Sequence, residues 1–185
     1  MGSSVTSSND ATLDRVQRRT LLKLGLAGSA ALALAGGGAA LLYEPAWRGG
    51  RLTHHGRTVL AAVARAVLDG SLPSEGGPRH VALSAHLERM DTTLRAMPPS
   101  TQREVGLLLA VLAAPPGRIA LAGLVADWPH ADVVQIQAAL QSMRTSRMAL
   151  RQQAYHALRD LTHAAYFADA ATWSQLGYPG PVQIA

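Results

Sequence analysis

The sequence predicts an all-α protein: a small irregular bundle of about five helices with one long C-terminal helix, after an N-terminal signal or anchor helix. Hydrophobic residues make up 48% of the 185 residues, but aromatic residues only 4%. The apolar content is therefore mostly Ala, Leu and Val, which suits closely packed helices better than sheets. Apolar residues recur at spacings of three and four, and no alternating strand of convincing length is present.

The chain divides into three parts. Residues 1–43 form a leader, residues 44–52 a short linker rich in Pro, Gly and Arg, and residues 53–185 a helical accessory domain. The last part has about 130 residues, the usual size of a single domain with one modest core.

The first four helices of this domain are separated by turn-forming Pro and Gly residues. They are expected at residues 53–69, 79–97, 101–114 and 118–126. Thr101 and Glu104 have the spacing of a capping box at the start of the third helix. Because that helix is apolar on most sides, we expect it to be the central one.

The last helical segment is predicted from an uninterrupted pattern. Residues 132–167 contain no Pro or Gly and carry a continuous apolar stripe, so one long helix is the simplest interpretation. Asp169 is expected to cap a final turn that ends at Leu176 and Gly177.

The leader resembles a twin-arginine export signal. Its core is the run Gln17-Arg18-Arg19-Thr20-Leu21-Leu22-Lys23, in which Leu21 stands where Phe is commonest and Gln17 where Ser or Thr is commonest. The export-signal residues are Arg18, Arg19, Leu21, Leu22 and Lys23. The twin-arginine translocase reads such a leader as an address, so the protein is expected in the periplasm.

Two fates of the leader stay open. The uncharged stretch of residues 24–43 has 20 residues, close to the ~20 that span a bilayer as a helix, so an uncleaved leader would anchor the chain to the inner membrane. A cleaved leader would be cut at one of three small-residue sites, at Ala33-Leu34-Ala35, Ala39-Ala40 or Glu44-Pro45-Ala46.

Charge and cysteine content exclude several classes of protein. The net charge is +5, but from Gly49 onward 12 Arg face only 9 acidic residues, and these arginines are spread along the helices without aromatic platforms. Nucleic acid is therefore not an expected partner.

The chain has no cysteine, which excludes covalent c-type haem, cysteine-ligated iron–sulfur clusters, thiolate zinc sites and disulfides within it. Any redox centre would belong to a partner.

No catalytic, cofactor-binding or metal-ligating residue is predicted. Histidines that are near neighbours in the sequence are His54 and His55, His80 and His86, and His156 and His163. None of these pairs has the i, i+4 spacing that places two ligands on one helical face. There is also no Gly-x-Ser-x-Gly elbow and no carboxylate pair marked by its context.

Arg144, Arg147 and Arg151 are candidate partner contacts. Arg147 falls on the apolar stripe of the predicted long helix, with the other two one turn either side. An arginine there must extend to the surface, pair with an acidic residue such as Asp127 or Asp132, or face a partner.

The C-terminal segment supplies the other candidate partner contacts. These are Tyr166, Trp173, Tyr178, Pro179 and Pro181. The Pro-Gly-Pro tail is pre-ordered, so docking it costs little conformational entropy. Two interpretations stay open, because the segment would either pack on its own core or bind in a groove of a partner.

With these residues in view, the chain resembles the small subunits of periplasmic flavin-dependent dehydrogenases of the glucose–methanol–choline type, including the gluconate 2-dehydrogenase subunit 3 family. The resemblance rests on the leader at Arg18-Arg19, on the small helical domain without cofactor motifs, and on the closing run. That run is Ala165-Tyr166-Phe167…Trp173…Gly177-Tyr178-Pro179-Gly180-Pro181, preceded by Arg144-Thr145-Ser146-Arg147.

The resemblance implies a non-catalytic escort. In that family the small subunit is thought to carry the export signal for a leaderless catalytic subunit, so that the folded, FAD-loaded enzyme crosses with it. The implied partners are the FAD-dependent catalytic subunit, the twin-arginine translocase and, as a further subunit, a c-type cytochrome. The alternative is a free-standing periplasmic or membrane-anchored helical binding or scaffold protein.

Overall fold

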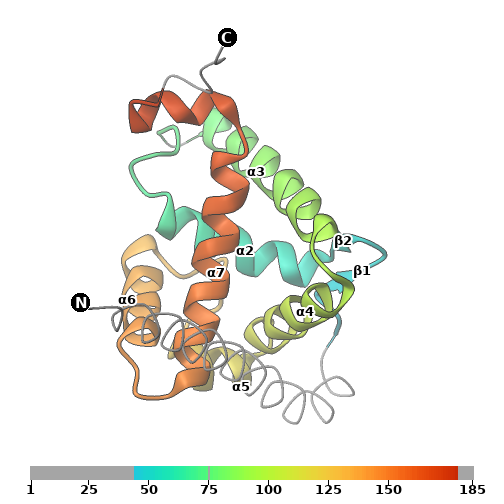
Figure 1. Ribbon diagram of the computed structural model, residues 1–185. Coiled ribbons are helices and arrows are strands. Elements are labelled where there is room, and N and C mark those ends of the chain that lie inside the picture. The colour runs from blue at the N-terminus through green and yellow to red at the C-terminus, as the bar shows by residue number, and fades with distance from the viewer. Residues whose placement is uncertain (1–43, 75, 179–185) are drawn as a thin grey trace, which may run out of the picture.

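The computed structural model describes residues 44–74 and 76–178, and the predicted all-α class is confirmed for them (Figure 1). The helices are α2 (His54–Val67), α3 (Gly77–Ala96), α4 (Pro99–Ala113), α5 (Pro115–Gly117), α6 (Val133–Arg144) and α7 (Ala149–Phe167). The shorter elements are the strands β1 (Trp47–Arg48) and β2 (Arg51–Leu52), the π-helical turn η1 (Arg118–Ala122) and the 3-10 helix η2 (Ala170–Leu176).

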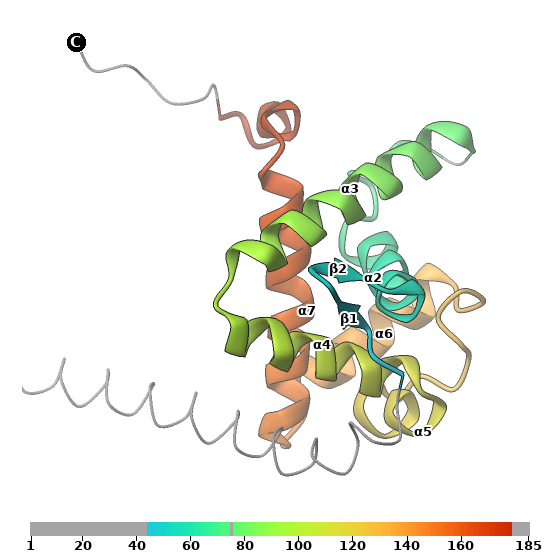
Figure 2. The same ribbon diagram turned by 90° about the vertical axis from the view of Figure 1, so that its right-hand side faces the viewer.

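The centre of the bundle is α2, which contacts α3, α4, α6 and α7. In Figure 1 it crosses the middle of the molecule behind α7, and Figure 2 shows α3 and α4 on either side of the hairpin. The prediction that residues 101–114 are central is wrong. Small buried side chains such as Ala62 and Ala66 let neighbouring helices approach α2 closely, whereas α4 keeps Arg103 and Glu104 exposed.

The core includes a tryptophan from the turn after η1. Trp128 is only 2% exposed and packs among leucines and methionines of several helices. Its indole Nε1 donates a hydrogen bond of 2.7 Å to the carbonyl of Leu112, which satisfies the one polar group of a buried tryptophan. The turn after η1 is thereby fixed to the end of α4.

The prediction of one long helix over residues 132–167 is wrong, because the chain breaks between α6 and α7. At the break the Ser146 side chain accepts a hydrogen bond from the Met148 backbone N–H at 3.1 Å. The Gln152 side chain donates to the Ser146 carbonyl at 2.7 Å, and the Thr145 hydroxyl donates to the carbonyl one turn earlier. Serine and threonine side chains thus replace helical hydrogen bonds without any Pro or Gly.

The capping boxes also differ from expectation. The predicted box at Thr101 and Glu104 is wrong, because α4 already begins at Pro99, where proline suits the first helical position. A capping box instead starts α6. The Asp132 side chain accepts from the Gln135 backbone N–H at 2.7 Å, and the Gln135 side chain accepts from the Asp132 backbone N–H at 3.1 Å.

The final turn is confirmed. Asp169 accepts a hydrogen bond from the Ala171 backbone N–H at 3.0 Å and caps η2. The element ends at Leu176, and Gly177 follows with a φ of +67°, a conformation that glycine adopts without strain. Asp169 also pairs with Arg89 of α3 at 3.2 Å, so the cap joins the C-terminal turn to α3.

The predicted linker of residues 44–52 is instead a hairpin that packs on the core. Strands β1 and β2 pair antiparallel across Gly49 and Gly50, whose φ values of +58° and +76° fit a tight two-residue turn. Ala46 is fully buried and Leu52 is 6% exposed. The hairpin therefore belongs to the helical domain.

A buried carboxylate fixes the hairpin to two helices. Asp91 of α3 is 1% exposed and accepts hydrogen bonds from the Leu52 backbone N–H at 2.7 Å and from Arg57 of α2 at 3.3 Å. Arg57 also pairs with the exposed Glu88, which lies 3.8 Å from Arg51 of the hairpin. These contacts join β2, α2 and α3 at one end of the bundle.

Replacing Gly56 by Ala should destabilise the domain by about 2 kcal/mol or more, as overpacking a close-packed site does. A Cβ at Gly56 would lie 2.4 Å from the Ala46 carbonyl oxygen, so the hairpin would have to move. Urea unfolding of the purified chain measures the effect. Gly77→Ala is the matched control, because a Cβ there meets nothing within 4 Å. Equal stability of the two variants would contradict the prediction.

Candidate partner-binding surfaces

The structure separates the three predicted arginines. Arg151 is half-buried, and its guanidinium donates to the Leu121 carbonyl at 2.8 Å and to the Ser142 hydroxyl at 3.1 Å. Arg144 is exposed and donates to Gln141 at 3.0 Å. Arg151 therefore serves the fold by holding η1 and α6 together.

Arg147 lies exposed in the break between α6 and α7. The suggested pairing with Asp127 or Asp132 is wrong, since Asp127 binds His130 at 2.8 Å and Asp132 caps α6. Among residues 44–74 and 76–178, Arg147 forms no ion pair. Because the helix breaks before it, Arg147 does not lie on an apolar stripe.

The aromatic residues of the C-terminal segment also separate. Tyr166 is 5% exposed in a small cluster with Ala64 and Leu68, and its hydroxyl donates to the Ser71 carbonyl at 3.0 Å. Tyr166 thus belongs to the chain's own core.

Trp173 and Tyr178 lie at the surface end of the same segment. The Trp173 indole is half-buried and donates to the Phe167 carbonyl at 2.7 Å. Tyr178 is 48% exposed, with its ring centroid 5.6 Å from that of Trp173. Pro179 and Pro181 lie outside the described residues, as do the export-signal residues Arg18, Arg19, Leu21, Leu22 and Lys23.

An apolar groove of about 380 Å³ lies between the segment after η1 and α6. Its lining includes Val125 and Ala138, and Val125 is 76% exposed. Val134, one helical turn before Ala138, is 72% exposed. Exposed valines next to a groove of small side chains form a surface that a partner could cover.

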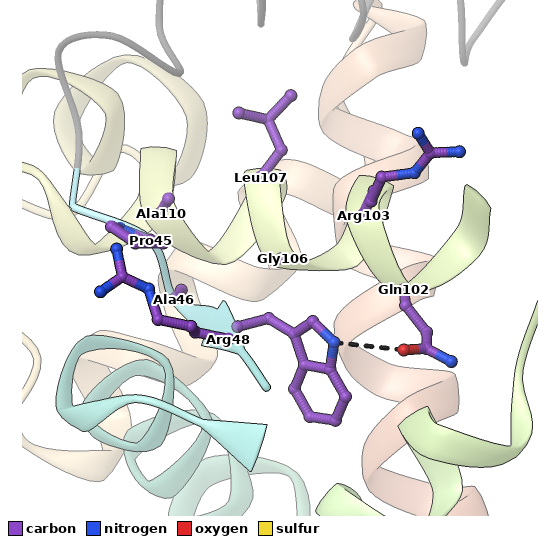
Figure 3. Close-up of a pocket in the computed structure, with 9 residues that line it drawn as sticks. Pro45, Ala46, Arg48, Gln102, Arg103, Gly106, Leu107 and Ala110 are labelled. Carbon is purple, nitrogen blue, oxygen red and sulfur yellow. Dashed lines mark hydrogen bonds between the residues drawn. The ribbon is translucent and has the colours of Figure 1, made fainter. Parts of the chain in front are cut away.

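A second groove, here called the β1–α4 groove, has a volume of about 350 Å³. Its apolar lining comes from Pro45, Ala46, Trp47, Leu107 and Ala110. Figure 3 shows Leu107 and Arg103 extending from the same side of α4, with Pro45 and Ala46 approaching from the hairpin. No motif or spacing in the sequence predicted this site.

The wall of the β1–α4 groove is fixed by close contacts. A Cβ at Gly106 would lie 2.9 Å from the Trp47 Cβ, so only glycine lets β1 approach α4 this closely. The Trp47 indole donates to Gln102 at 3.3 Å, and Gln102 in turn donates to the Met97 carbonyl at 2.8 Å. A glycine inside an apolar helix was the available signal for this close approach.

One histidine is fully internal. His86 is 1% exposed, and its ring centroid lies 6.2 Å from that of Tyr166. Neither ring nitrogen has a hydrogen-bond partner among the described residues. Burial, and secondarily the nearby Arg89 guanidinium, lowers the pKa of His86 from 6.5 to about 4. His86 is therefore neutral at physiological pH.

Among residues 44–178 without residue 75, no group of three or more His, Cys, Asp or Glu side chains is arranged to hold a metal ion. No single helix of the range has the length and apolar content of a membrane span. The segments Pro99–Ala113 and Pro115–Ala122 reach those limits only together, and they meet at a bend of 93°.

Comparison with known proteins adds no relative to these observations. No family model, no curated protein and no solved structure matches the chain.

Proposed function

We propose that this chain is the non-catalytic small subunit of a periplasmic FAD-dependent sugar or alcohol dehydrogenase. It escorts a leaderless catalytic flavoprotein through the twin-arginine translocase and stabilises it after export. The observation that carries the proposal is the leader at Arg18-Arg19, joined to a small helical domain. FAD belongs to the partner, and a c-type cytochrome is a further candidate subunit.

The physical logic of an escort supports this proposal. The twin-arginine route moves folded proteins, and a flavin must be inserted before export. A catalytic subunit without its own leader therefore needs a bound chain that supplies one. The absence of cysteine from this chain agrees with a redox centre held by another subunit.

The surface of the domain offers sites for such a partner. The groove beside α6 carries the exposed Val125 and Val134. Arg147 is exposed in the α6–α7 break and Tyr178 is half-exposed beside Trp173. Arg147 and Tyr178 lie beyond opposite ends of α7, so they mark separate surfaces, and exposed arginine and tyrosine side chains are each enriched at protein–protein interfaces.

Replacing Arg18-Arg19 by Lys-Lys should retain both proteins in the cytoplasm. The translocase reads the arginine pair as an address, and the lysine pair keeps the charge but not the guanidinium groups. Periplasmic dehydrogenase activity should therefore fall to background, while cytoplasmic flavoprotein accumulates. Activity assays and immunoblots of separated periplasm and cytoplasm measure both quantities.

Arg15→Lys is the matched control, since it makes the same chemical change in the same leader outside the pair. This variant should export normally. Undiminished periplasmic dehydrogenase activity with the Lys-Lys chain retained in the cytoplasm would refute the escort mechanism.

The second candidate function is a free-standing periplasmic or membrane-anchored helical scaffold. The uncharged stretch of residues 24–43 favours the anchored form, because its length approaches that of a membrane span. Purification of the native chain distinguishes the two functions. Recovery of intact chain from membranes without any flavoprotein would favour the scaffold.

A further inference from the structure

We infer that the β1–α4 groove holds the end of the leader, Leu41-Leu42-Tyr43, in the folded full-length chain. The inference concerns this chain alone and does not depend on the dehydrogenase partner. Three features of the groove support it: its position where the leader joins the domain, its apolar lining with a basic rim, and its size.

The position of the groove places the leader at its edge. The described chain begins at Glu44, and the next residue, Pro45, already lines the groove. Thr53 fixes this entry point, because its hydroxyl donates to the Pro45 carbonyl at 2.8 Å and its backbone N–H donates to the Ala46 carbonyl at 3.0 Å. A chain spans at most about 3.5 Å per residue, so Leu41 reaches no further than about 14 Å from Pro45.

Attachment to the same chain favours this occupant over a free molecule. A short tether gives the attached segment an effective concentration on the order of millimolar at the groove. Leu41, Leu42 and Tyr43 are all apolar or amphipathic, and their burial against Trp47 and Leu107 removes apolar surface from water.

The charge around the groove selects which part of the leader enters. Arg48 and Arg103 line the groove and are exposed. Two positive charges there disfavour the cationic part of the leader at Arg18, Arg19 and Lys23. The uncharged end of the leader meets no such repulsion, so the arginine pair stays free for the translocase.

The size of the groove limits the segment. Its lining on α4 runs from Gln102 to Ala110, about 12 Å along the helix axis, whereas a 20-residue helix is about 30 Å long. The groove therefore holds a few side chains from the leader's end and not the whole apolar stretch of residues 24–43.

This arrangement restricts where the leader is cleaved. Ala46 is fully buried, its carbonyl accepts the Thr53 hydrogen bond, and the same oxygen abuts Gly56. Cleavage after Ala46 would require this anchored segment to leave the domain. Cleavage at Ala33-Leu34-Ala35 or Ala39-Ala40 leaves the groove-binding residues attached to the exported protein. The mature N-terminus is therefore at or before Leu41.

Engineered cysteines test the inference in the full-length chain, which has no cysteine of its own. Leu42→Cys is combined with Arg103→Cys at the groove, and with His54→Cys as the matched control. His54 is exposed and does not line the groove, but its neighbour His55 contacts Glu44 at 2.7 Å, so the same short tether brings Leu42 near it. The rate of intrachain disulfide formation with oxidised glutathione is measured at several protein concentrations by non-reducing electrophoresis and peptide mass spectrometry.

The groove pair should oxidise at least about tenfold faster than the control pair, at a rate independent of protein concentration. Equal rates for the two pairs would overturn the inference, as would disulfides that form only between chains and increase with concentration. The latter result would indicate that a second copy occupies the groove. A mature N-terminus at Trp47, found by sequencing the exported protein, would also overturn it.

A second cysteine pair tests whether the result depends on the loss of the Arg103 charge. Leu42→Cys with Leu107→Cys places the thiol on the apolar lining of the same groove. Thermal unfolding followed by circular dichroism confirms that each reduced variant is folded. Both groove pairs should show the fast intrachain reaction, and a slow reaction of both folded variants would contradict occupancy by the leader.

Discussion

Asp91→Ala is expected to destabilise the domain by about 3 kcal/mol or more, the cost of breaking a buried ion pair and leaving buried polar groups unpaired. The substitution leaves the buried Leu52 backbone N–H without its acceptor and removes the buried partner of Arg57. Urea unfolding monitored by circular dichroism measures the change in the free energy of unfolding. The hairpin should lose its protection from hydrogen exchange first.

Glu88→Ala is the matched control for this prediction. Glu88 contacts the same Arg57 but is exposed, and an exposed ion pair contributes about 0–1 kcal/mol. Asp91→Asn should fall between the two variants, because its amide oxygen still accepts from the Leu52 N–H. If Glu88→Ala destabilised the domain as much as Asp91→Ala, the charge on Arg57 and not the hairpin bond would be the main contribution.

Acidification is expected to destabilise the domain through His86. Its pKa is lowered to about 4 in the folded chain from 6.5, so below pH 6.5 the unfolded state binds the proton that the folded state excludes. Stability is complete above about pH 6.5 and is lost as the pH falls toward about 4. The loss reaches about 2 kcal/mol near pH 5 and about 3 kcal/mol in total.

The groups around His86 explain the direction of this effect. Its ring faces Tyr166, and the charged Arg89 nearby is itself held by the Ala165 carbonyl at 3.0 Å and by Asp169 at 3.2 Å. A protonated His86 would therefore be buried beside a cation and without an acceptor. The pKa of His163 is also lowered, mainly by burial and secondly by the nearby Arg159 charge, whereas the Asp160 carboxylate acts in the opposite direction.

His86→Phe should remove most of the pH dependence. The phenyl ring keeps the edge contact with Tyr166 and has no titrating group. His80→Phe, six residues earlier on the same helix and exposed, is the matched control and should leave the slope intact. The free energy of unfolding of each variant is measured between ~pH 7.5 and ~5, and the slopes against pH are compared. An unchanged slope in His86→Phe would assign the effect to other groups, His163 included.

The fold class could be predicted from the sequence because helical periodicity is local. The Pro and Gly residues correctly predicted where the first helices end, and Asp169 correctly predicted the start of η2. The break between α6 and α7 at Ser146 could not be predicted from Pro and Gly residues. Its hydrogen bonds come from serine and threonine side chains, which helices also tolerate. Asp132 with Gln135 had capping-box spacing, and that signal was missed.

The surfaces were harder to predict than the helices because they depend on contacts distant in sequence. Asp91 reaches Leu52 across 39 residues, and Tyr166 reaches Ser71 across 95. No spacing rule identifies such partners. The Gly49-Gly50 pair could have indicated the hairpin, since adjacent glycines fit a two-residue turn. The groove that this hairpin forms with α4 then follows from Gly106.

Thr53 gives the folded domain a mechanical attachment point. Any pull on the leader enters the domain at Pro45 and Ala46, and the two hydrogen bonds from Thr53 bear the load first. The Leu52–Asp91 bond joins β2, which immediately precedes Thr53, to α3. Fraying of the domain from its N-terminal side therefore has to break these hydrogen bonds before it reaches α2.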